Sequence, residues 1–303
     1  MTMELIERYQ GCLLGLAVGD ALGASVEFLS RGSFPPVTDM QGGGAFNLDP
    51  GQWTDDTSMA LCLAESLIEK KGFDAYDQMV RYLRWYRTGY LSSTGRCFDI
   101  GRTTAVALCT FENTREPFSG PTDSHSAGNG SLMRLAPVPM FFFPDRDAAI
   151  FHAAESSRTT HGSQECIDAC RLFASILFNT FSGMNKERVL LEHDEGIVKV
   201  PKISEIARGS YRGKKDKQIQ GSGYVVKSLE AALWCFYTTN SFQDAVLKAA
   251  NLGDDADTTA AICGQVTGAF YGIGSIPTSW RECIAMSQEI ETLATSLYTN
   301  RGS

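Results

Sequence analysis

Apolar residues recur at intervals of three and four positions along most of the chain. In residues 5–22 they include Leu5, Tyr9, Cys12 and Leu16, a spacing that places them on one buried helix face. The same spacing predicts further helices over residues 59–68, 76–86, 104–111, 148–156, 166–181, 225–237, 245–252, 258–271 and 290–298. Only residues 196–200 show the alternation of apolar and polar residues that is typical of a β-strand. The pattern therefore predicts an all-α fold built from ten or more helices.

Three long segments without this spacing connect the predicted helices. Residues 30–53 and 112–131 are rich in glycine, proline and aspartate, and loops of this length in a compact domain usually have a function. Residues 208–223 place several basic residues among glycines, which favours a mobile surface loop over a dedicated binding patch. No internal repeat and no Pro/Ser-rich linker divides the chain, so we expect residues 1–303 to form a single domain.

The composition narrows the function classes. The chain has 27 basic and 35 acidic residues, a net charge of −8, whereas a nucleic-acid-binding surface needs a basic excess. No apolar run approaches the ~20 residues of a membrane span, and the N-terminus lacks a signal-peptide core. Nine cysteines without a C-x-x-C pair indicate reduced core residues. We expect a cytoplasmic protein that binds neither nucleic acid nor membrane. We also expect a monomer, because no exposed apolar heptad or edge strand is evident.

Two clusters of aspartate and threonine stand immediately before apolar helices. One is Trp-Thr-Asp-Asp-Thr at residues 53–57, and the other is Gly-Asp-Asp-Ala-Asp-Thr-Thr at residues 253–259. Either cluster alone could cap its helix, since Asp and Thr side chains accept hydrogen bonds from a first turn. Capping needs only one such residue, whereas the two clusters together hold five aspartates and four threonines.

Five carboxylates brought together would repel one another unless a cation neutralised them. Oxygen ligands of this kind favour Mg²⁺, Mn²⁺ or Ca²⁺ over zinc. An EF-hand is excluded, because neither cluster has the glycine and glutamate that such a loop requires. This number of oxygens suits two divalent ions with water at the open positions. We therefore expect a metal site where the two clusters meet.

Glycines recur at every fourth position of the first predicted helix, at Gly11, Gly15, Gly19 and Gly23. They leave one side of the helix without side chains, so another helix can approach closely. Glu27 follows this helix beside a phenylalanine. It can be an ordinary surface residue or an acid of the functional site.

Three further positions each allow a structural and a functional interpretation. The sequence Gly-Asn-Gly-Ser at residues 128–131 can form an ordinary turn or present backbone N–H groups to a phosphate. His161, one of only four histidines, can be a hydrogen-bonded core residue or a catalyst. Asp99 lies between apolar residues ahead of a predicted helix, where N-capping is the structural interpretation.

Seven short motifs follow one another along the chain. They begin with the glycine-rich helix and Glu27, Gly-Gln-Trp-Thr-Asp-Asp-Thr at 51–57, and Gly-Arg-Cys-Phe-Asp-Ile-Gly at 95–101. They continue with Gly-Asn-Gly-Ser-Leu-Met-Arg at 128–134, Thr-His-Gly at 160–162, Gly-Tyr-Val-Val at 223–226 and the cluster at 253–259. In these motifs and their order the chain resembles the ADP-ribosylglycohydrolases over most of its length. Within that family it looks most similar to the bacterial dinitrogenase reductase-activating glycohydrolases.

The resemblance implies a compact multi-helix, all-α fold with a binuclear Mg²⁺ or Mn²⁺ centre in a cleft. By position in the motifs, it implies that metal ligands come from both clusters: Thr54, Asp55 and Asp56 on one side, and Asp255, Asp257 and Thr258 on the other. Asp254 stands where vertebrate members often have a second glycine, so the resemblance favours a supporting role beside the ligands for it over that of a ligand.

The resemblance also implies contacts with an ADP-ribosyl substrate. The diphosphate and its neighbouring ribose would be held by the loop of Gly128, Asn129, Gly130 and Ser131 together with His161, and the adenine would stack on Tyr224. Glu27 matches an acid that gates the site or contacts the distal ribose. Asp99 matches the place where the arginine guanidinium of a modified protein arrives.

The implied reaction is hydrolysis of the N-glycosidic bond between ADP-ribose and an arginine side chain, which releases ADP-ribose from a mono-ADP-ribosylated protein. Asp56, Asp257 or Glu27 could take the proton from the attacking water, and Asp99 could hold the leaving guanidine. One alternative is a non-enzymatic member that only binds ADP-ribose. Another is a hydrolase of a serine, O-acetyl-ADP-ribose or nucleobase linkage. Asp99 favours arginine, because a neutral leaving group would leave that carboxylate unpaired.

Overall fold

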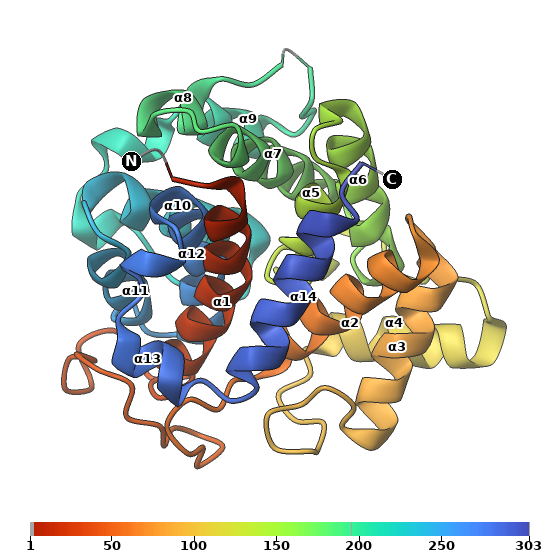
Figure 1. The fold of residues 1–303 in the computed structure, drawn as a ribbon, viewed down its shortest axis with the longest axis horizontal. Helices are drawn as coiled ribbons and strands as arrows, with labels where there is room; N and C mark the ends of the chain where they lie inside the picture. Colours follow the sequence, from red (N-terminus) through yellow and green to blue (C-terminus); the bar gives the residue numbers. More distant parts are fainter. Residues whose placement is uncertain (1–2, 195, 303) are drawn as a thin grey trace.

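The computed structural model describes residues 3–194 and 196–302, and helices make up its regular structure (Figure 1). The α-helices are α1 Leu5–Ala24, α2 Asp55–Lys70, α3 Ala75–Thr88, α4 Arg102–Thr114, α5 Pro137–Phe142, α6 Arg146–Thr160, α7 Gln164–Phe181, α8 Lys186–Leu191, α9 Pro201–Ala207, α10 Val225–Thr238, α11 Phe242–Ala250, α12 Ala256–Tyr271, α13 Thr278–Cys283 and α14 Ser287–Thr299. Short 3₁₀ turns lie between them: η1 Ser124–Ser126, η2 Ser210–Gly213, η3 Asp216–Gln218 and η4 Ile273–Ser275. The described residues contain no β-strand, which confirms the all-α prediction.

Every helix predicted from the apolar spacing is present, with ends that differ by a few residues. The short helices α5, α8, α9 and α13 were not predicted, because six or seven residues are too few to display a helical period. The strand predicted at 196–200 is wrong. The Asp168 carboxylate accepts hydrogen bonds from the N–H groups of Lys199 at 2.5 Å and Val200 at 2.8 Å, and it thereby takes up the groups that a strand would pair. The expected surface loop at 208–223 contains η2 and η3, and it packs buried side chains against the core.

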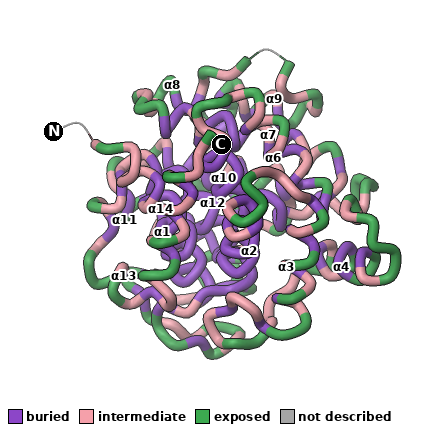
Figure 2. Tube along the Cα trace, turned by 45° about the vertical axis from the view of Figure 1, so that its right-hand side comes forward, coloured by how far each residue is buried: buried purple, intermediate pink, exposed green. Residues whose placement is uncertain are grey.

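The centre of the molecule is the pair formed by α1 and α12, and all residues of α1 from Gly11 to Ala24 are buried (Figure 2). A Cβ atom built on Gly11 would lie 2.3 Å from the carbonyl oxygen of Gly268, and one on Gly15 would lie 2.4 Å from that of Gly264. In the other direction, a Cβ atom built on Gly268 would lie 1.9 Å from the carbonyl oxygen of Gly11, and one on Gly264 would lie 2.0 Å from that of Gly15. The two backbones therefore touch, and the predicted close approach of a second helix is confirmed.

The close contact between α1 and α12 continues to the C-terminal end of α1. A Cβ atom on Gly19 would lie 2.1 Å from the carbonyl oxygen of Ala260, and one on Gly23 would lie 2.4 Å from the Cα atom of Asp257. The C-terminal end of α1 thus meets the N-terminal end of α12. The helix α2 also begins here, because the hydroxyl of Thr54 donates to Asp20 of α1 at 2.9 Å.

The remaining helices enclose this central pair. The last helix, α14, packs on α1 and α2, so the first and last helices of the chain lie side by side (Figure 1). On other sides α7, α10 and α11 pack against α12. Within the described residues, no helix combines the length and the apolar character needed to span a bilayer.

We expect Gly19→Ala to lower the free energy of unfolding by about 1–3 kcal/mol, because the new methyl group would meet the Ala260 carbonyl at 2.1 Å. Gly213→Ala is the matched control, since nothing lies within 4 Å of its Cβ position and its φ is not left-handed. Urea denaturation of both variants measures the difference. A Gly19→Ala protein as stable as the control would contradict the backbone contact between α1 and α12.

A candidate metal and substrate site

The first turn of α2 carries Thr54, Asp55 and Asp56 into the interior. The preceding residue, Trp53, is fully buried and fixes the chain there: its indole N–H donates to the carbonyl of Ala285 at 3.0 Å, and its own carbonyl accepts from the hydroxyl of Ser93 at 2.6 Å. Thr54 is the N-cap residue, but its side chain does not cap the helix. Capping therefore does not explain this cluster.

Asp20 of α1 caps α2 instead, and it is a site residue that the sequence analysis missed. Its Oδ1 accepts from the N–H of Thr54 at 2.8 Å and its Oδ2 from the N–H of Thr57 at 3.0 Å, and both threonine hydroxyls also donate to it. Burial raises the pKa of Asp20 to about 6, and these hydrogen bonds oppose the rise. The available signal was an acid inside an apolar, glycine-rich helix, which is costly to bury without partners.

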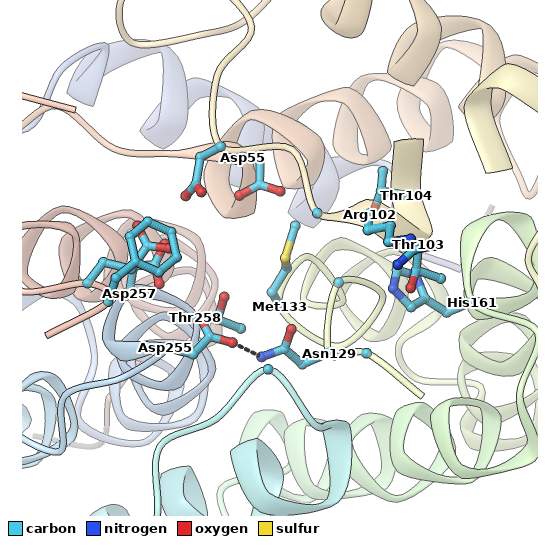
Figure 3. A pocket seen from close by; sticks show the side chains of 17 residues that line it. Asp55, Arg102, Thr103, Thr104, Asn129, Met133, His161, Asp255, Asp257 and Thr258 are labelled. Atoms are coloured by element: carbon cyan, nitrogen blue, oxygen red, sulfur yellow. Dashed lines mark hydrogen bonds between the residues drawn. The ribbon is translucent and has the colours of Figure 1, made fainter. Parts of the chain in front are cut away.

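The second cluster forms the start of α12, and hydrogen bonds tie it to the first. Asp255 is the N-cap residue, yet its side chain does not cap the helix and instead accepts from the Asn129 amide at 2.7 Å (Figure 3). The hydroxyl of Thr54 lies 3.2 Å from a carboxylate oxygen of Asp257, 203 positions away in the chain. The hydroxyl of Thr258 donates to Asp56 at 3.4 Å. The two clusters therefore meet.

Seven carboxylates gather where these helix ends converge. They form three overlapping groups, in each of which one oxygen per residue lies within 4.8 Å of the others: Asp20, Asp56 and Asp257; Glu27, Asp255 and Asp257; Asp55, Asp99 and Asp257. Asp257 belongs to all three groups and occupies the centre. Among the described residues, no lysine or arginine forms an ion pair with any of the seven.

Burial first, and the neighbouring carboxylates second, raise the pKa of several of these acids. Burial, followed by the charge of Asp99 and other neighbours, raises the pKa of Glu27 to about 10. Burial, followed by the charge of Asp20, raises the pKa of Asp99 to about 7. Burial first and neighbouring carboxylates second hold three pKa values well above the ordinary range, those of Asp55, Asp56 and Asp257. The negative charge of the assembly must therefore be neutralised, either by protons that stay on some of the acids or by bound cations.

The donor set fits divalent cations. Three buried carboxylate oxygens have no hydrogen-bond partner: Oε2 of Glu27, Oδ1 of Asp56 and Oδ1 of Asp257. Such atoms are costly to bury unless a cation or a proton satisfies them. Among the described residues, each of the three groups offers carboxylate oxygens alone, which suits Mg²⁺, Mn²⁺ or Ca²⁺ and not zinc.

A pocket of about 270 Å³ opens over the carboxylates and includes most of the predicted site residues. Those that line it are Glu27, Asp55, Asp99, Gly128, Asn129, Gly130, His161, Asp255, Asp257 and Thr258. Thr54, Asp56 and Ser131 are buried and do not line it. The sequence analysis missed other lining residues: Phe28, Gly101, Arg102, Thr103, Thr104, Met133 and Gly223.

The loop at residues 128–131 wraps around the imidazole of His161. A Cβ atom on Gly130 would lie 2.7 Å from Cε1 of His161, so a side chain there would displace the ring, and one on Gly128 would lie 3.2 Å from Nε2, a tight contact. The N–H groups of Gly130 and Ser131 donate to no other described residue. Gly130 also lines the pocket, so its N–H is available to an anionic ligand there.

The tautomer of His161 follows from its hydrogen bonds. Arg134 can only donate, and its guanidinium donates to the hydroxyl of Thr160 at 2.7 Å. We assign the ring proton to Nε2, because the hydroxyl can then donate its own proton to Nδ1, 2.9 Å away, while it accepts from Arg134. Burial, followed by the charge of Arg134, lowers the pKa of His161 to about 3, so the ring is neutral near pH 7. The pocket therefore receives a neutral N–H donor.

Asp99 lies in the loop before α4 with its backbone in the left-handed region, at φ 57°. The N-cap of α4 is Gly101, so the capping interpretation of Asp99 is wrong. One of its carboxylate oxygens lies within 4.8 Å of an oxygen of Asp55 and an oxygen of Asp257. Asp99 is partly exposed and lines the pocket. It can therefore meet a cationic group that enters from outside.

Two other sequence candidates lie apart from the carboxylates. The backbone of Tyr224 pairs with that of Gly128, but its side chain does not line the pocket, and its hydroxyl accepts from Lys202 at 2.6 Å. Asp254 is exposed and belongs to none of the three carboxylate groups. Its backbone instead exchanges two hydrogen bonds of 2.8 Å with Phe28 and Leu29.

A helical fold with this carboxylate-lined pocket agrees with the comparison to known proteins. The chain belongs to the ADP-ribosylglycohydrolase family, whose family model matches residues 1–303. It is 44% identical over 295 residues to the ADP-ribosylarginine hydrolase Tri1 of Pseudomonas putida (strain GB-1). This match covers 97% of this chain and 79% of that protein.

Two further similarities bear on the expected branch of the family. The chain is 30% identical over 296 residues to the ADP-ribosyl-dinitrogen reductase glycohydrolase of Rhodospirillum rubrum, covering 94% of this chain and 92% of that protein. A solved chain described as an ADP-ribosylglycohydrolase-related protein complex superposes with a TM-score of 0.88 at 42% identity, over 98% of this chain and 99% of that one. The expected resemblance to the dinitrogen reductase enzyme is present, and the Tri1 relative shares more identical residues.

We expect the melting temperature in EDTA to fall as the pH rises from about 5 to about 8. Acids whose pKa is higher in the folded chain stabilise the fold below their unfolded value, about 4. That contribution is lost as the pH rises through the folded values, which are about 6 for Asp20 and about 7 for Asp99. Mg²⁺ or Mn²⁺ should replace the protons and raise the melting temperature more at pH 8 than at pH 5.

The metal-dependent part of this effect should vanish in Asp257→Asn, because Asp257 belongs to all three carboxylate groups. Differential scanning fluorimetry with and without each ion measures both curves. A metal effect of the same size at both pH values would contradict competition between protons and cations at these acids.

Proposed function

We propose that this chain is a metal-dependent hydrolase that removes ADP-ribose from arginine side chains of mono-ADP-ribosylated proteins. Water would cleave the N-glycosidic bond, and ADP-ribose would leave as the product. One observation carries the proposal: a single pocket joins a carboxylate assembly at one end to a neutral histidine N–H and Arg102 at the other (Figure 3). The Tri1 name of the Pseudomonas putida relative supports arginine as the modified residue.

We infer that two Mg²⁺ or Mn²⁺ ions bind among the carboxylates. Thr54, Asp55 and Asp56 would hold them from α2, and Asp255, Asp257 and Thr258 from α12. When bound, such ions act as Lewis acids, make water more acidic and neutralise developing negative charge. The unpartnered oxygens of Asp56 and Asp257 support this assignment. Asp20 would position Thr54 and the first turn of α2.

The diphosphate would bind at the opposite end of the pocket. His161 and Gly130 both line this end of the pocket, and the imidazole Nε2–H and the N–H of Gly130 are neutral donors that suit phosphate oxygens, with Ser131 next in the same loop. Gly128 and Asn129 would complete this loop, and Tyr224 would contact the adenine beyond it. Binding energy from the ADP half, away from the reacting bond, would position the distal ribose over the carboxylates.

Proton transfer falls to the acids around the distal ribose. Glu27 and Asp257 line the pocket, whereas Asp56 is buried and does not, which favours Glu27 or Asp257 over Asp56 as the base that takes a proton from water. Asp99 would hold the leaving guanidine, because a planar cation pairs with a carboxylate through two hydrogen bonds. Its partial exposure at the pocket supports this role.

The setting of the enzyme is also inferred. All nine cysteines are unpaired, which suits a reducing compartment such as the cytoplasm. Buried apolar residues from α1 to α14 form one continuous cluster, which supports a single domain over residues 1–303. We further propose a monomer that binds no nucleic acid, in keeping with the net charge of −8.

We expect ADP-ribose to be released from an arginine-ADP-ribosylated protein with Mg²⁺ or Mn²⁺ and not with EDTA. A serine-ADP-ribosylated protein serves as the parallel substrate, and it should release little, because a neutral hydroxyl does not pair with Asp99. Chromatographic detection of free ADP-ribose measures both reactions. If ADP-ribose binds but neither substrate is cleaved, the chain is a binding protein and not a hydrolase. Cleavage of the serine linkage alone would assign it to a different ADP-ribosyl bond.

We expect Asp55→Asn and Asp257→Asn to lower kcat/KM for the arginine substrate by about 100-fold or more, because each removes a carboxylate from the proposed metal site. Asp254→Asn is the matched control, since this neighbouring aspartate is exposed and lies outside the carboxylate groups. Full activity in the first two variants would exclude a mechanism that depends on the carboxylate assembly.

A further inference from the structure

Three phenylalanines form a row that starts at the pocket with Phe28, and we call Phe28, Phe46 and Phe98 the aromatic row. The rings of Phe28 and Phe46 are 6.1 Å apart with an interplanar angle of 71°, and those of Phe46 and Phe98 are 5.2 Å apart at 57°. Phe28 and Phe46 belong to the connection between α1 and α2, and Phe98 belongs to the connection between α3 and α4, so the fold brings the two connections together. Phe28 is 64% exposed, which is unusual for a large apolar side chain.

The aromatic row stands at the acidic end of the pocket. Phe28 lines the pocket and directly follows Glu27, while Phe98 directly precedes Asp99. The opposite end carries the donors: Figure 3 shows Asp55, Asp255 and Asp257 on one side of the pocket, and Arg102 and His161 on the other. The aromatic row therefore lies next to the part of the pocket that attracts cations.

The backbone holds Phe28 in a fixed and strained position. Its φ of 64° is left-handed, a conformation that a bulky residue rarely adopts. Its N–H donates to the carbonyl of Asp254 at 2.8 Å, and the N–H of Asp254 donates to the carbonyl of Leu29 at 2.8 Å. Both the strain and the exposure of the ring are unfavourable for stability. Strain of this kind, kept next to a pocket, indicates a functional role for the side chain.

We propose that the aromatic row binds the side chain of the ADP-ribosylated arginine, which makes Phe28 a specificity-determining residue. The inference rests on the proposed arginine hydrolase function. In this arrangement the guanidinium lies between the pocket acids, Glu27 and Asp99, and the methylene arm packs against the ring of Phe28. An arginine offers both groups in the required order, a cation for the carboxylates and an apolar arm for the rings.

The arrangement also orients the ligand. ADP-ribosylarginine has an anionic diphosphate on one side of the distal ribose and a cationic guanidinium on the other. The pocket has donors at one end and carboxylates beside aromatic rings at the other, so the complementary charges allow one direction of binding. The aromatic row then lies where the arginine side chain leaves the pocket toward the rest of the modified protein.

The test compares two small substrates that share the scissile bond and the guanidinium. ADP-ribosyl-arginine has the methylene arm, and ADP-ribosyl-guanidine lacks it. For Phe28→Ala we expect the ratio of kcat/KM for ADP-ribosyl-arginine to that for ADP-ribosyl-guanidine to fall about tenfold, mainly through the KM of the first. Phe28→Leu keeps an apolar contact and should restore part of the ratio. Phe151→Ala is the matched control, because Phe151 is 59% exposed on α6 and does not line the pocket.

Each other outcome overturns the inference in a recognisable way. An unchanged ratio in Phe28→Ala means that the ring does not contact the arm. An equal loss for both substrates means that Phe28 acts on the shared part of the site, and a matching fall in melting temperature would identify a structural role. Failure of the unmodified chain to cleave either substrate would refute the hydrolase proposal itself, and the inference with it.

Discussion

The backbone contact between α1 and α12 is the constraint on which the rest of the site depends. Gly19 and Gly23 let the C-terminal end of α1 touch the first turn of α12, and any side chain there would force the helices apart. Asp20 follows Gly19 directly, and through Thr54 it is linked to Asp257 by hydrogen bonds of 2.8–3.2 Å. A separation of one ångström would break these bonds, so a stripe of small residues sets the geometry of the carboxylates.

Concentrating seven carboxylates has a cost that the surrounding packing must offset. Burial and then mutual repulsion raise the pKa values of Glu27, Asp56 and Asp257, and one oxygen of each has no hydrogen-bond partner. A long central helix that is buried on all sides supplies the apolar contacts that hold these groups together. The buried carboxylates, which destabilise the fold, lie at the pocket, and the apolar packing that stabilises it lies behind them. This division is expected where a site is kept for binding.

The sequence predicted those features that depend on residues within a single helix. Apolar spacing located every long helix, and the two Asp-Thr clusters were recognisable because each precedes such a helix. Asp20 was missed because its partners, Thr54 and Thr57, lie more than thirty positions away, so its own helix gives no sign of them. The strand error at 196–200 has the same origin, since Asp168 of α7 takes those N–H groups. Contacts between distant segments cannot be read from local periodicity.

An acidic chain can bind an anionic ligand when the groups around the ligand are hydrogen-bond donors, whatever the net charge of the whole chain. Arg134 is fully buried behind the 128–131 loop, and it donates to the carbonyl of Gly130 at 2.7 Å and to Thr160 at 2.7 Å. Its charge opposes protonation of His161, so the imidazole remains a neutral donor whose orientation Thr160 fixes. A neutral donor can approach a diphosphate without adding a mobile charge close to the carboxylates. The pocket can therefore keep its anion-binding and cation-binding ends separate, and this separation allows one substrate to bind in one direction.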